Sequence, residues 1–216
     1  MPMSHDFEAF YQGEPLAPGL RHNGIPWDIA QPQPAIAGLD FRGDVLDVGC
    51  GLGDNAAFVA GQGLRVTAVD SSPTAIAEAR QRFPDSGVRF AVADATDLAG
   101  YAASFDTVLS CALFHCLDDT DRIRHLHALR RATRPGAVLH LLTFSDQVVD
   151  GLPSPFPQSE QDVRKPLSDN GWTITDFGEA TLIANGLTMV AYFDAVGRPP
   201  RERPALPCWV VRAVKE

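Results

Sequence analysis

Residues 44–55 read DVLDVGCGLGDN, and this stretch decides the fold. Its apolar start predicts a buried strand, and glycines at positions 49, 51 and 53 follow that strand directly. Glycine loses more conformational entropy than any other residue when it is ordered. Three glycines in five residues therefore indicate a backbone that turns sharply and that another group approaches closely. The identity of that group has to be inferred from the rest of the sequence.

The overall composition favours one globular domain and disfavours nucleic acid as a partner. The chain has 216 residues, of which 45% are hydrophobic and 21% charged, enough for one domain with a full core. Its formal net charge is −9, and Lys165 and Lys215 are its only lysines. Binding to a nucleic-acid backbone needs a basic footprint, and the sequence contains no basic run. We therefore expect a small-molecule ligand.

The sequence also argues against a membrane-spanning segment, a secretory signal and a metal site. The longest apolar runs, such as residues 137–144, are much shorter than a membrane span. Residues 1–14 lack the basic segment and apolar segment of a secretory signal. The four cysteines form neither a CxxC pair nor a zinc-type spacing, which is typical of free thiols in a reducing compartment. We expect a cytoplasmic protein with no metal site.

Strands and helices alternate from residue 44 onward. Apolar runs predict strands, and periodic segments between them predict helices; one helix begins with Ser72 as its cap and Pro73 at its first position. The predicted strands are 44–49, 65–70, 88–94, 105–111, 137–144, 171–180 and 208–216, and the predicted helices are 54–61, 73–83, 119–133 and 159–170. This order predicts an α/β fold with a Rossmann-like, doubly wound, mostly parallel sheet and a C-terminal antiparallel strand pair. Within a single domain (1–216) we expect an N-terminal arm over the cofactor site (1–43), a cofactor-binding core (44–145) and a part with the substrate loop and last strands (146–216).

The glycine loop does not fit the common phosphate-binding motifs. A Walker A loop needs a lysine after its glycines, and no lysine precedes Lys165. The dinucleotide fingerprint G-x-G-x-x-G would need its third glycine at Asp54, where a negative charge would face the pyrophosphate. An NAD-dependent oxidoreductase is therefore a disfavoured alternative.

Acidic residues around the loop favour a cationic nucleoside. Asp47 and Asp54 flank the glycines, although Asp54 also stands where a helix dipole would favour an acid. Asp70 ends the second strand, 21 residues after Gly49, where a carboxylate can accept hydrogen bonds from ribose hydroxyls. Asp94 follows the third strand and can reach an adenine amino group. S-adenosylmethionine (SAM) combines these features.

Five segments, taken in order, resemble the successive motifs of class I SAM-dependent methyltransferases: VLDVGCGLG, VTAVDSS, ADATDL, FDTVLSCALFHCL and RPGAVLHLLTF. The resemblance covers residues 44–145. It implies that the glycines pass the methionine part of SAM, that Asp47 faces its ammonium, and that Cys111 lines the cofactor cleft. The cofactor residues expected in this core are Asp47, Gly49, Gly51, Gly53, Asp70, Ser71, Asp94, Ala95 and Cys111.

The N-terminal arm carries a second resemblance. Residues 25–39, IPWDIAQPQPAIAGL, resemble the PWD…PQP segment of small-molecule methyltransferases of the thiopurine, halide/thiol, tellurite-resistance and benzoquinone types. The likeness implies that the arm folds over the cofactor and that Trp27 closes the site, with its ring toward the sulfonium. An alternative is that Trp27 only packs the arm onto the sheet.

The predicted acceptor pocket is aromatic. The segment after the fourth strand, SCALFH, lacks the Asn/Asp-Pro-Pro-aromatic motif of nucleic-acid amino-methyltransferases. We expect His115 there to be the general base, with Asp118 and Asp119 orienting it or raising its pKa, or else to be a packed histidine. The expected acceptor walls are Phe10, Tyr11, Trp27, Phe114, His115 and Phe144.

The sequence therefore predicts a methyltransferase that moves the methyl group of SAM to an O, S or N nucleophile of a small aromatic or heteroaromatic acceptor, such as a phenol, quinol, thiol or N-heterocycle. Transfer needs the two reacting atoms held in line, and a base only for a protonated nucleophile. A non-catalytic SAM-fold protein that binds a ligand is the alternative, because methyl transfer requires no signature residue. Residues 151–157 form a candidate lid.

Overall fold

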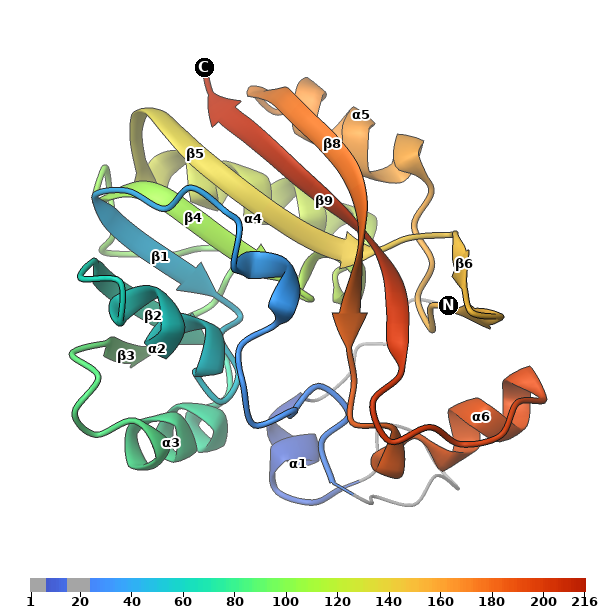
Figure 1. Cartoon of the computed structure of the whole chain (residues 1–216). Coiled ribbons are helices and arrows are strands. Elements are labelled where there is room, and N and C mark those ends of the chain that lie inside the picture. Colours follow the sequence, from blue (N-terminus) through green and yellow to red (C-terminus); the bar gives the residue numbers. More distant parts are fainter. Residues whose placement is uncertain (1–6, 15–23) are drawn as a thin grey trace.

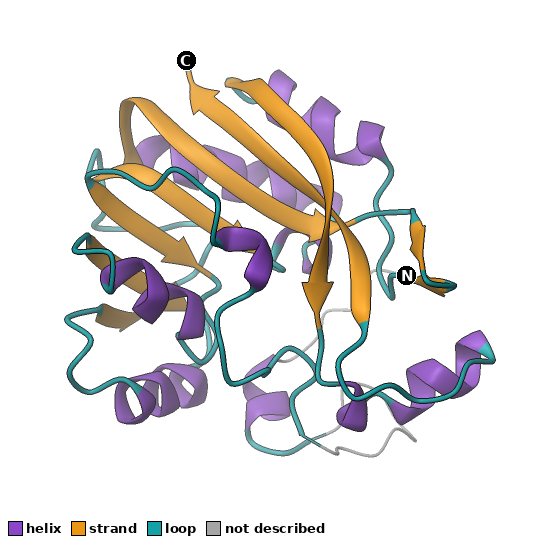
Figure 2. Cartoon of the chain, in the orientation of Figure 1, coloured by secondary structure: helices purple, strands orange, loops and turns teal. Residues whose placement is uncertain are grey.

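The computed structural model describes residues 7–14 and 24–216. Figure 1 shows helices packed around one twisted sheet, and Figure 2 marks the same elements by type. The elements in chain order are α1 (Phe7–Tyr11), η1 (Pro34–Ile36), β1 (Asp44–Val48), α2 (Asp54–Ala60), β2 (Arg65–Asp70), α3 (Pro73–Arg82), β3 (Arg89–Val92), β4 (Phe105–Cys111), η2 (Phe114–Cys116), α4 (Asp119–Ala132), β5 (Thr133–Phe144), β6 (Val148–Val149), β7 (Leu152–Pro153), α5 (Glu160–Asp169), β8 (Trp172–Ile183), η3 (Gly186–Thr188), α6 (Val190–Val196) and β9 (Ala205–Lys215).

The main sheet has seven strands in the order β3-β2-β1-β4-β5-β9-β8. The pairs within β1 to β5 are parallel, whereas β9 runs antiparallel to both β5 and β8. The chain order reverses between β1 and β4, which is the switch point where open α/β sheets bind ligands. The predicted α/β architecture, with its late antiparallel strands, is confirmed.

Two apolar layers cover the sheet. One face packs on α4 and α5, through residues such as Leu129 and Leu167. The opposite face packs on η1, α2 and α3, through residues such as Ile36, Val59 and Ile76. Because successive residues of β1 point to opposite faces, Leu46 joins the first layer and Val45 the second. Both layers leave the carboxyl ends of β1 to β5 free for the loops that follow.

The structure adds elements to segments for which the sequence predicted none. Helix α1 lies in the arm, where no helix or strand was predicted, and the β6–β7 hairpin lies in the expected substrate loop after β5. The segment between the last two strands folds into η3 and α6, the latter ending at Gly197 in the left-handed conformation (φ 64°). Helices of five and seven residues are too short to form alone, so tertiary contacts rather than local propensity stabilise them.

Candidate active site

A cavity of about 670 Å³ opens at the carboxyl ends of the parallel strands. The loops after β1 to β5 form its floor, and the arm and the η3–α6 segment wall it. Most residues that the sequence singled out line this cavity: Phe10, Tyr11, Trp27, Gly49, Gly51, Asp70, Ser71, Asp94, Ala95, Cys111, His115 and Phe144.

Two expected wall or loop residues serve packing instead. Phe114 is fully buried in the layer beneath α4, with the Arg122 guanidinium 5.1 Å from its ring centre, so the expectation that it lines the acceptor pocket is corrected. Gly53 has φ +88°, and a Cβ there would lie 2.7 Å from the Phe90 ring. Its missing side chain makes room for packing between α2 and β3, and the residue lies outside the cavity lining.

The first two glycines shape the loop at the cavity floor. Gly49 and Gly51 have φ values of +72° and +52°, a region that side chains disfavour. The Gly49 and Cys50 amides both donate to the Val69 carbonyl, at 2.8 and 3.0 Å, which fixes the loop to β2. A Cβ on Gly51 would lie 3.0 Å from the Tyr11 hydroxyl, so the loop and the arm meet at this glycine.

Asp70 connects the glycine loop to the start of α3. Its Oδ2 accepts a hydrogen bond from the Gly51 amide at 2.9 Å, and its Oδ1 accepts one from the Ser72 amide at 3.0 Å. Burial raises the pKa of this carboxyl despite these hydrogen bonds. Each carboxylate oxygen keeps a further lone pair, so Asp70 can still accept from two vicinal hydroxyls of a ribose.

Asp47 is the buried acid beside this loop. It is 2% exposed, does not line the cavity, and its Oδ2 has no hydrogen-bond partner among the described residues. Burial first, and the charge of Asp70 second, raise its pKa to about 7. Two neighbouring acids without a cation are costly, and a ligand ammonium near the loop would offset that cost. The two carboxylates beside the loop therefore fit the positively charged SAM.

The turn after β3 forms the far end of the cofactor half. Asp94 Oδ1 accepts hydrogen bonds from the Thr96 amide and hydroxyl, at 2.7 and 2.8 Å. His125, fully buried on α4, bonds through Nδ1 to the Ala95 carbonyl at 2.8 Å. Because a carbonyl only accepts, Nδ1 of His125 carries the proton. His127 is exposed, so the two histidines of α4 point to different faces of the helix.

The arm is attached to the start of α3 by Glu8. Its carboxylate accepts hydrogen bonds from the Ser72 and Thr74 hydroxyls, at 2.5 and 2.7 Å, and from the Thr74 amide at 3.2 Å. These donors lower the pKa of Glu8 to about 2. Behind this attachment Trp27 packs among aromatic rings of α1 and donates from Nε1 to the Tyr11 hydroxyl at 2.8 Å.

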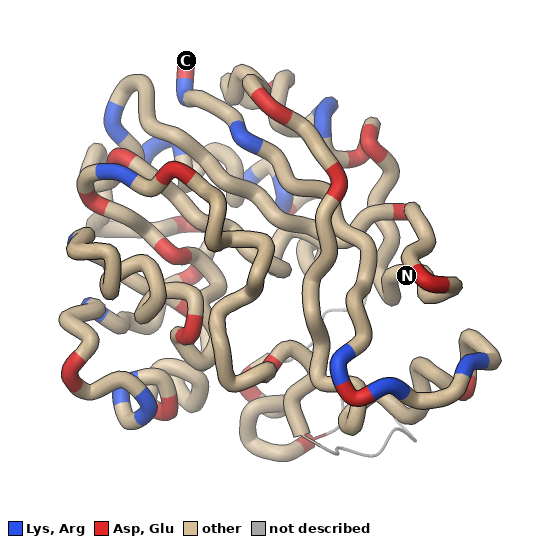
Figure 3. Tube along the Cα trace, in the orientation of Figure 1, with Lys and Arg blue, Asp and Glu red and all other residues tan. Residues whose placement is uncertain are grey.

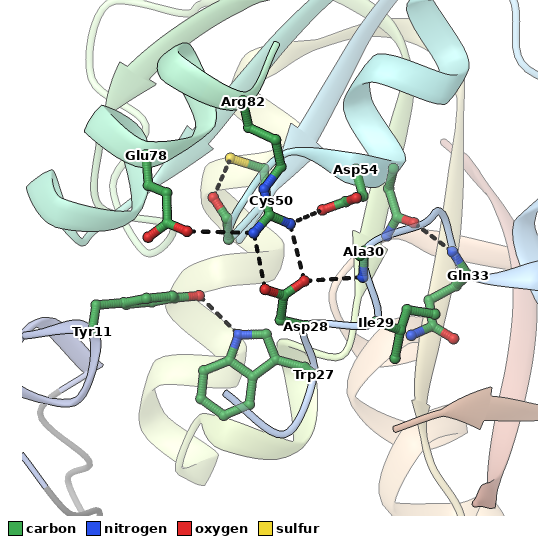
Figure 4. A network of polar contacts seen from close by, with 12 residues as sticks. Tyr11, Trp27, Asp28, Ile29, Ala30, Gln33, Cys50, Asp54, Glu78 and Arg82 are labelled. Carbon is green, nitrogen blue, oxygen red and sulfur yellow. Dashed lines mark hydrogen bonds and ion pairs between the residues drawn. The ribbon is translucent and has the colours of Figure 1, made fainter. Parts of the chain in front are cut away.

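The arm is also attached to the end of α3. Arg82 binds both carboxylate oxygens of Asp28 at 2.9 Å, Asp54 at 3.0 Å and Glu78 at 3.3 Å (Figure 4). The guanidinium lowers the pKa of Asp28 and is itself held charged. The charge of Asp54 is thus balanced by Arg82. Through this arginine, Asp54 links α2 to α3 and to the arm.

His115 begins the acceptor half of the cavity. Its ring stacks on Phe144, with ring centres 4.2 Å apart and planes 21° apart, and lies near-parallel to Phe156 at 6.0 Å. Burial, with the nearby Arg122 charge, lowers its pKa to about 3. The expected help from acids is corrected: Asp118 caps α4 through the Asp121 amide, and Asp119 is 99% exposed beside Arg122.

The described residues carry mixed charge and no metal-type cluster of side chains. Basic and acidic residues are interspersed along the trace in Figure 3. Within residues 7–14 and 24–216, no three His, Cys, Asp or Glu side chains are grouped as a metal site would need, and no helix is long and apolar enough to cross a membrane. The site therefore offers carboxylates to a cationic nucleoside and an aromatic, mostly apolar wall to its second ligand.

The comparisons with known proteins identify the family. A methyltransferase domain model matches residues 45–136, the segment from β1 to the start of β5. The chain belongs to the class I SAM-dependent methyltransferases that act on small molecules.

Individual relatives cover nearly the whole chain. The 2-heptyl-1-hydroxyquinolin-4(1H)-one methyltransferase of Mycobacteroides abscessus is 37% identical over 83% of this chain and 82% of its own. A solved structure described as "Conversion of a Disulfide Bond into a Thioacetal Group during Echinomycin Biosynthesis" is 34% identical, with a TM-score of 0.80 over 97% of this chain and 91% of its own. A SAM-dependent methyltransferase of Methanosarcina mazei, 22% identical, shares the fold with a TM-score of 0.66 over 86% of this chain and 98% of its own.

Proposed function

We propose that this methyltransferase transfers the methyl group of SAM to an oxygen nucleophile on a flat, largely apolar heteroaromatic compound. The observation that carries the proposal is the stack of aromatic rings on the cavity wall, formed by Phe144, His115 and Phe156. Stacked rings of this kind favour a planar ring as ligand. The relative from M. abscessus, named for a hydroxyquinolone, supports the same chemical class.

Distinct residues would hold the two ligands. Asp70 would accept from the ribose hydroxyls, the turn at Asp94 and Ala95 would meet the adenine, and the unpaired Asp47 would balance the ammonium. When bound, SAM supplies a methyl group on a positively charged sulfur that leaves readily. The protein's part is to hold the acceptor in line with that group, which contributes up to ~7–11 kcal/mol of barrier lowering in well-oriented reactions.

The far wall favours an acceptor with an apolar substituent. The cavity continues from His115 toward η3 and α6, where Ala184, Met189, Val190 and Leu206 line it. Ala184, Met189 and Leu206 belong to the small apolar cluster that packs on Phe193 of α6. A substituent without charge, attached to the flat ring, would displace water from this wall at a gain of about 0.8 kcal/mol per buried CH₂.

A sulfur acceptor is the second candidate. The structural relative associated with a disulfide-to-thioacetal conversion is similar over almost the whole chain. The apolar walls suit a weakly hydrated sulfur as well as an aromatic ring. Oxygen is ranked first because the relative from M. abscessus is named for a hydroxylated heteroaromatic compound.

A turnover panel tests the proposal. Purified protein and SAM are offered 1-hydroxyquinolin-4-ones with and without a 2-alkyl chain, simple phenols, aryl thiols and a cyclic disulfide, and methylated products are identified by mass. We expect O-methylation of the hydroxyquinolones, with higher kcat/KM for the alkylated ones. Turnover of the sulfur compounds alone would contradict an oxygen acceptor and favour a sulfur acceptor. Tight S-adenosylhomocysteine (SAH) binding without turnover of any compound would favour the non-catalytic alternative.

A further inference from the structure

We propose that His115 binds the acceptor as a neutral hydrogen-bond donor through Nε2–H, and that this enzyme methylates nucleophiles that are already anionic when they enter the site. This inference rests on the proposed function and specifies its substrate class: compounds whose O–H or S–H ionises near neutral pH. It replaces the sequence-based expectation that His115 is a general base.

The tautomer of His115 follows from its hydrogen bonds. The Phe144 amide donates to Nδ1 at 3.2 Å, and the Thr143 hydroxyl lies 3.3 Å from the same nitrogen. A backbone N–H can only donate, so Nδ1 contributes its lone pair and the proton of the neutral ring sits on Nε2. The basic nitrogen therefore faces β5, and the nitrogen available to a ligand is a donor.

Nε2 is available on the cavity side. The ring lines the cavity while Nδ1 is held against the end of β5, on the opposite side of the imidazole. Nε2 has no hydrogen-bond partner among the described residues, yet it is not one of their fully enclosed polar atoms. The stacked Phe144 ring and the parallel Phe156 ring restrict the imidazole plane, so the N–H direction is fixed before the acceptor arrives.

Burial and charge keep His115 neutral. Burial is the larger cause, because it disfavours the charged ring, and the cation of Arg122 on α4 adds to it. Asp118 and Asp119 are engaged at the start of α4, Asp162 of α5 is bonded to Ser159, and the Cys116 thiol is buried with a raised pKa. Protonation of the ring at neutral pH is therefore disfavoured by geometry and by charge.

Other bases on the cavity wall have partners or lie elsewhere. Asp28 and Asp54 are paired with Arg82, and Asp70 holds the glycine loop and α3. Burial raises the pKa values of Tyr11 and Cys111, which keeps both protonated. Asp194, exposed on α6, is the remaining carboxylate on the acceptor side of the cavity.

The reaction then needs no proton transfer inside the site. The acceptor loses its proton to solvent before binding, and its anionic oxygen or sulfur accepts the Nε2–H hydrogen bond. An electron pair of that atom forms the new bond to the methyl carbon as the carbon–sulfur bond breaks, and the broken bond's pair stays on the sulfur that becomes SAH. N-hydroxy heteroaromatics, electron-poor phenols and aryl thiols meet this requirement, whereas alcohols and unactivated phenols do not.

Nitrogen-15 NMR tests the tautomer independently of catalysis. Protein labelled at histidine is titrated from pH 5 to 8.5 with SAH present, and the His115 signals are assigned by their loss in His115→Gln. We expect a neutral ring with Nδ1 unprotonated over the whole range. A titration midpoint between pH 6 and 7, or a proton on Nδ1, would overturn the proposal even if methyl transfer is found.

Variant kinetics test the donor. His115→Gln keeps a donor and removes the base, whereas His115→Phe keeps a flat ring and removes the donor; exposed His127→Gln is the control. With an ionised acceptor we expect kcat/KM to fall less than about tenfold in the Gln variant and 10- to 100-fold in the Phe variant, with SAH affinity within twofold of wild type. Equal losses in both variants would make His115 a base and overturn the proposal.

The pH profile completes the test. Across acceptors of graded acidity, the acidic limb of kcat/KM should move with each acceptor's own pKa. A limb that stays fixed belongs to the enzyme and overturns the proposal, and its disappearance in Asp194→Asn would move the base to α6. If wild-type protein methylates none of the acceptors while the NMR result holds, the proposed function fails and the assigned donor geometry stands.

Discussion

Gly51 and Gly53 look equivalent in the sequence but meet different neighbours. Gly51 lies under the Tyr11 hydroxyl at the cavity floor, and Gly53 lies against the Phe90 ring in the core. Their shared positive φ explains the glycines, and the contacts explain why each is needed. A motif that resembles a ligand-binding loop thus also contains a packing position.

Gly53→Ala should destabilise the protein. The new methyl group would overlap the Phe90 ring and would sit at a positive φ, so we expect a loss of about 2–4 kcal/mol in unfolding free energy. Chemical denaturation measures it. SAH affinity of the folded protein should change less than threefold. A large loss of SAH affinity without loss of stability would contradict the packing role and mean that Gly53 contacts the ligand.

Asp47→Asn should stabilise the ligand-free protein at pH 8. In the native state the pKa of Asp47 is about 7, whereas an unfolded aspartate has a pKa near 4. Between these values the native state holds a proton that the unfolded chain has lost, so Asp47 lowers stability as pH rises through this window. The gain in the Asn variant is bounded at about 4 kcal/mol and vanishes near pH 4.

Denaturation of wild type and Asp47→Asn at pH 4 and pH 8 measures the effect, with exposed Asp85→Asn as the control. The same Asp47→Asn variant should bind SAH at least tenfold more weakly, because the ligand ammonium loses the negative charge of the buried carboxylate behind the loop. A stability difference independent of pH would contradict the pKa assignment.

Asp70→Ala should weaken SAH binding strongly. The substitution removes the two bonds that order the glycine loop and the start of α3 as well as the expected ribose acceptor. Charge-assisted hydrogen bonds contribute about 1.5–3 kcal/mol, so we expect roughly a 10- to 100-fold loss measured by calorimetry. Asp70→Asn, which keeps one acceptor, should fall between. Unchanged affinity in the Ala variant would remove the ribose assignment.

At the scale of elements, α3 anchors the arm at both of its ends. Glu8 binds the Ser72 and Thr74 hydroxyls at its start, and Asp28 binds Arg82 at its last residue. The helix also packs on β2 and β3, so the arm is positioned relative to the strands that end at Asp70 and at the adenine turn. This arrangement brings Trp27 and Tyr11 to the cavity without long-range sheet pairing.

Arg82→Met should loosen the arm. Methionine keeps much of the packing volume but leaves the half-buried Asp28 and Asp54 without a cation. We expect faster hydrogen exchange of the segment 24–33 and a several-fold loss of SAH affinity. Arg124→Met, which removes an exposed pair with Asp121, is the control. Equal exchange in both variants would mean that the aromatic packing of Trp27 alone holds the arm.

Local signals explain which elements could be predicted. The parallel strands are continuous apolar runs, and Ser72 with Pro73 marks the start of α3 in the sequence as in the structure. In contrast, α1 and α6 are short and depend on distant partners such as Ser72 for Glu8, which no local pattern records. The same limit applies to His115: its position after β4 was readable, but its tautomer depends on the Phe144 amide, 29 residues away.

At the scale of the whole molecule, the cavity is assembled from three distant parts of the chain. The arm closes one side, the loops after β1 to β5 form the floor, and the segment between β8 and β9 closes the other side. The arm and the last segment also touch: the Asn185 amide donates to the Pro26 carbonyl at 2.7 Å, and the Gln33 side chain bonds to the Ile183 backbone at 2.9 Å. Filling the cofactor half should therefore stabilise elements that are not neighbours in the sheet.

This coupling predicts a specific response to ligand. SAH at 100 times its dissociation constant should raise the unfolding free energy by about 2.7 kcal/mol, measured as a rise in Tm by calorimetry, whereas NAD should not raise it. At one fixed SAH concentration, the rise should be larger at pH 8 than at pH 5 for wild type, because the ligand ammonium is attracted to Asp47 only when that carboxyl is ionised, and it should be independent of pH for Asp47→Asn. Hydrogen exchange should slow in 24–33 and in 184–190 together, since the contacts between Pro26 and Asn185 join them. Protection limited to the loops after β1 and β2 would show that the cofactor half binds its ligand without closing the arm over it.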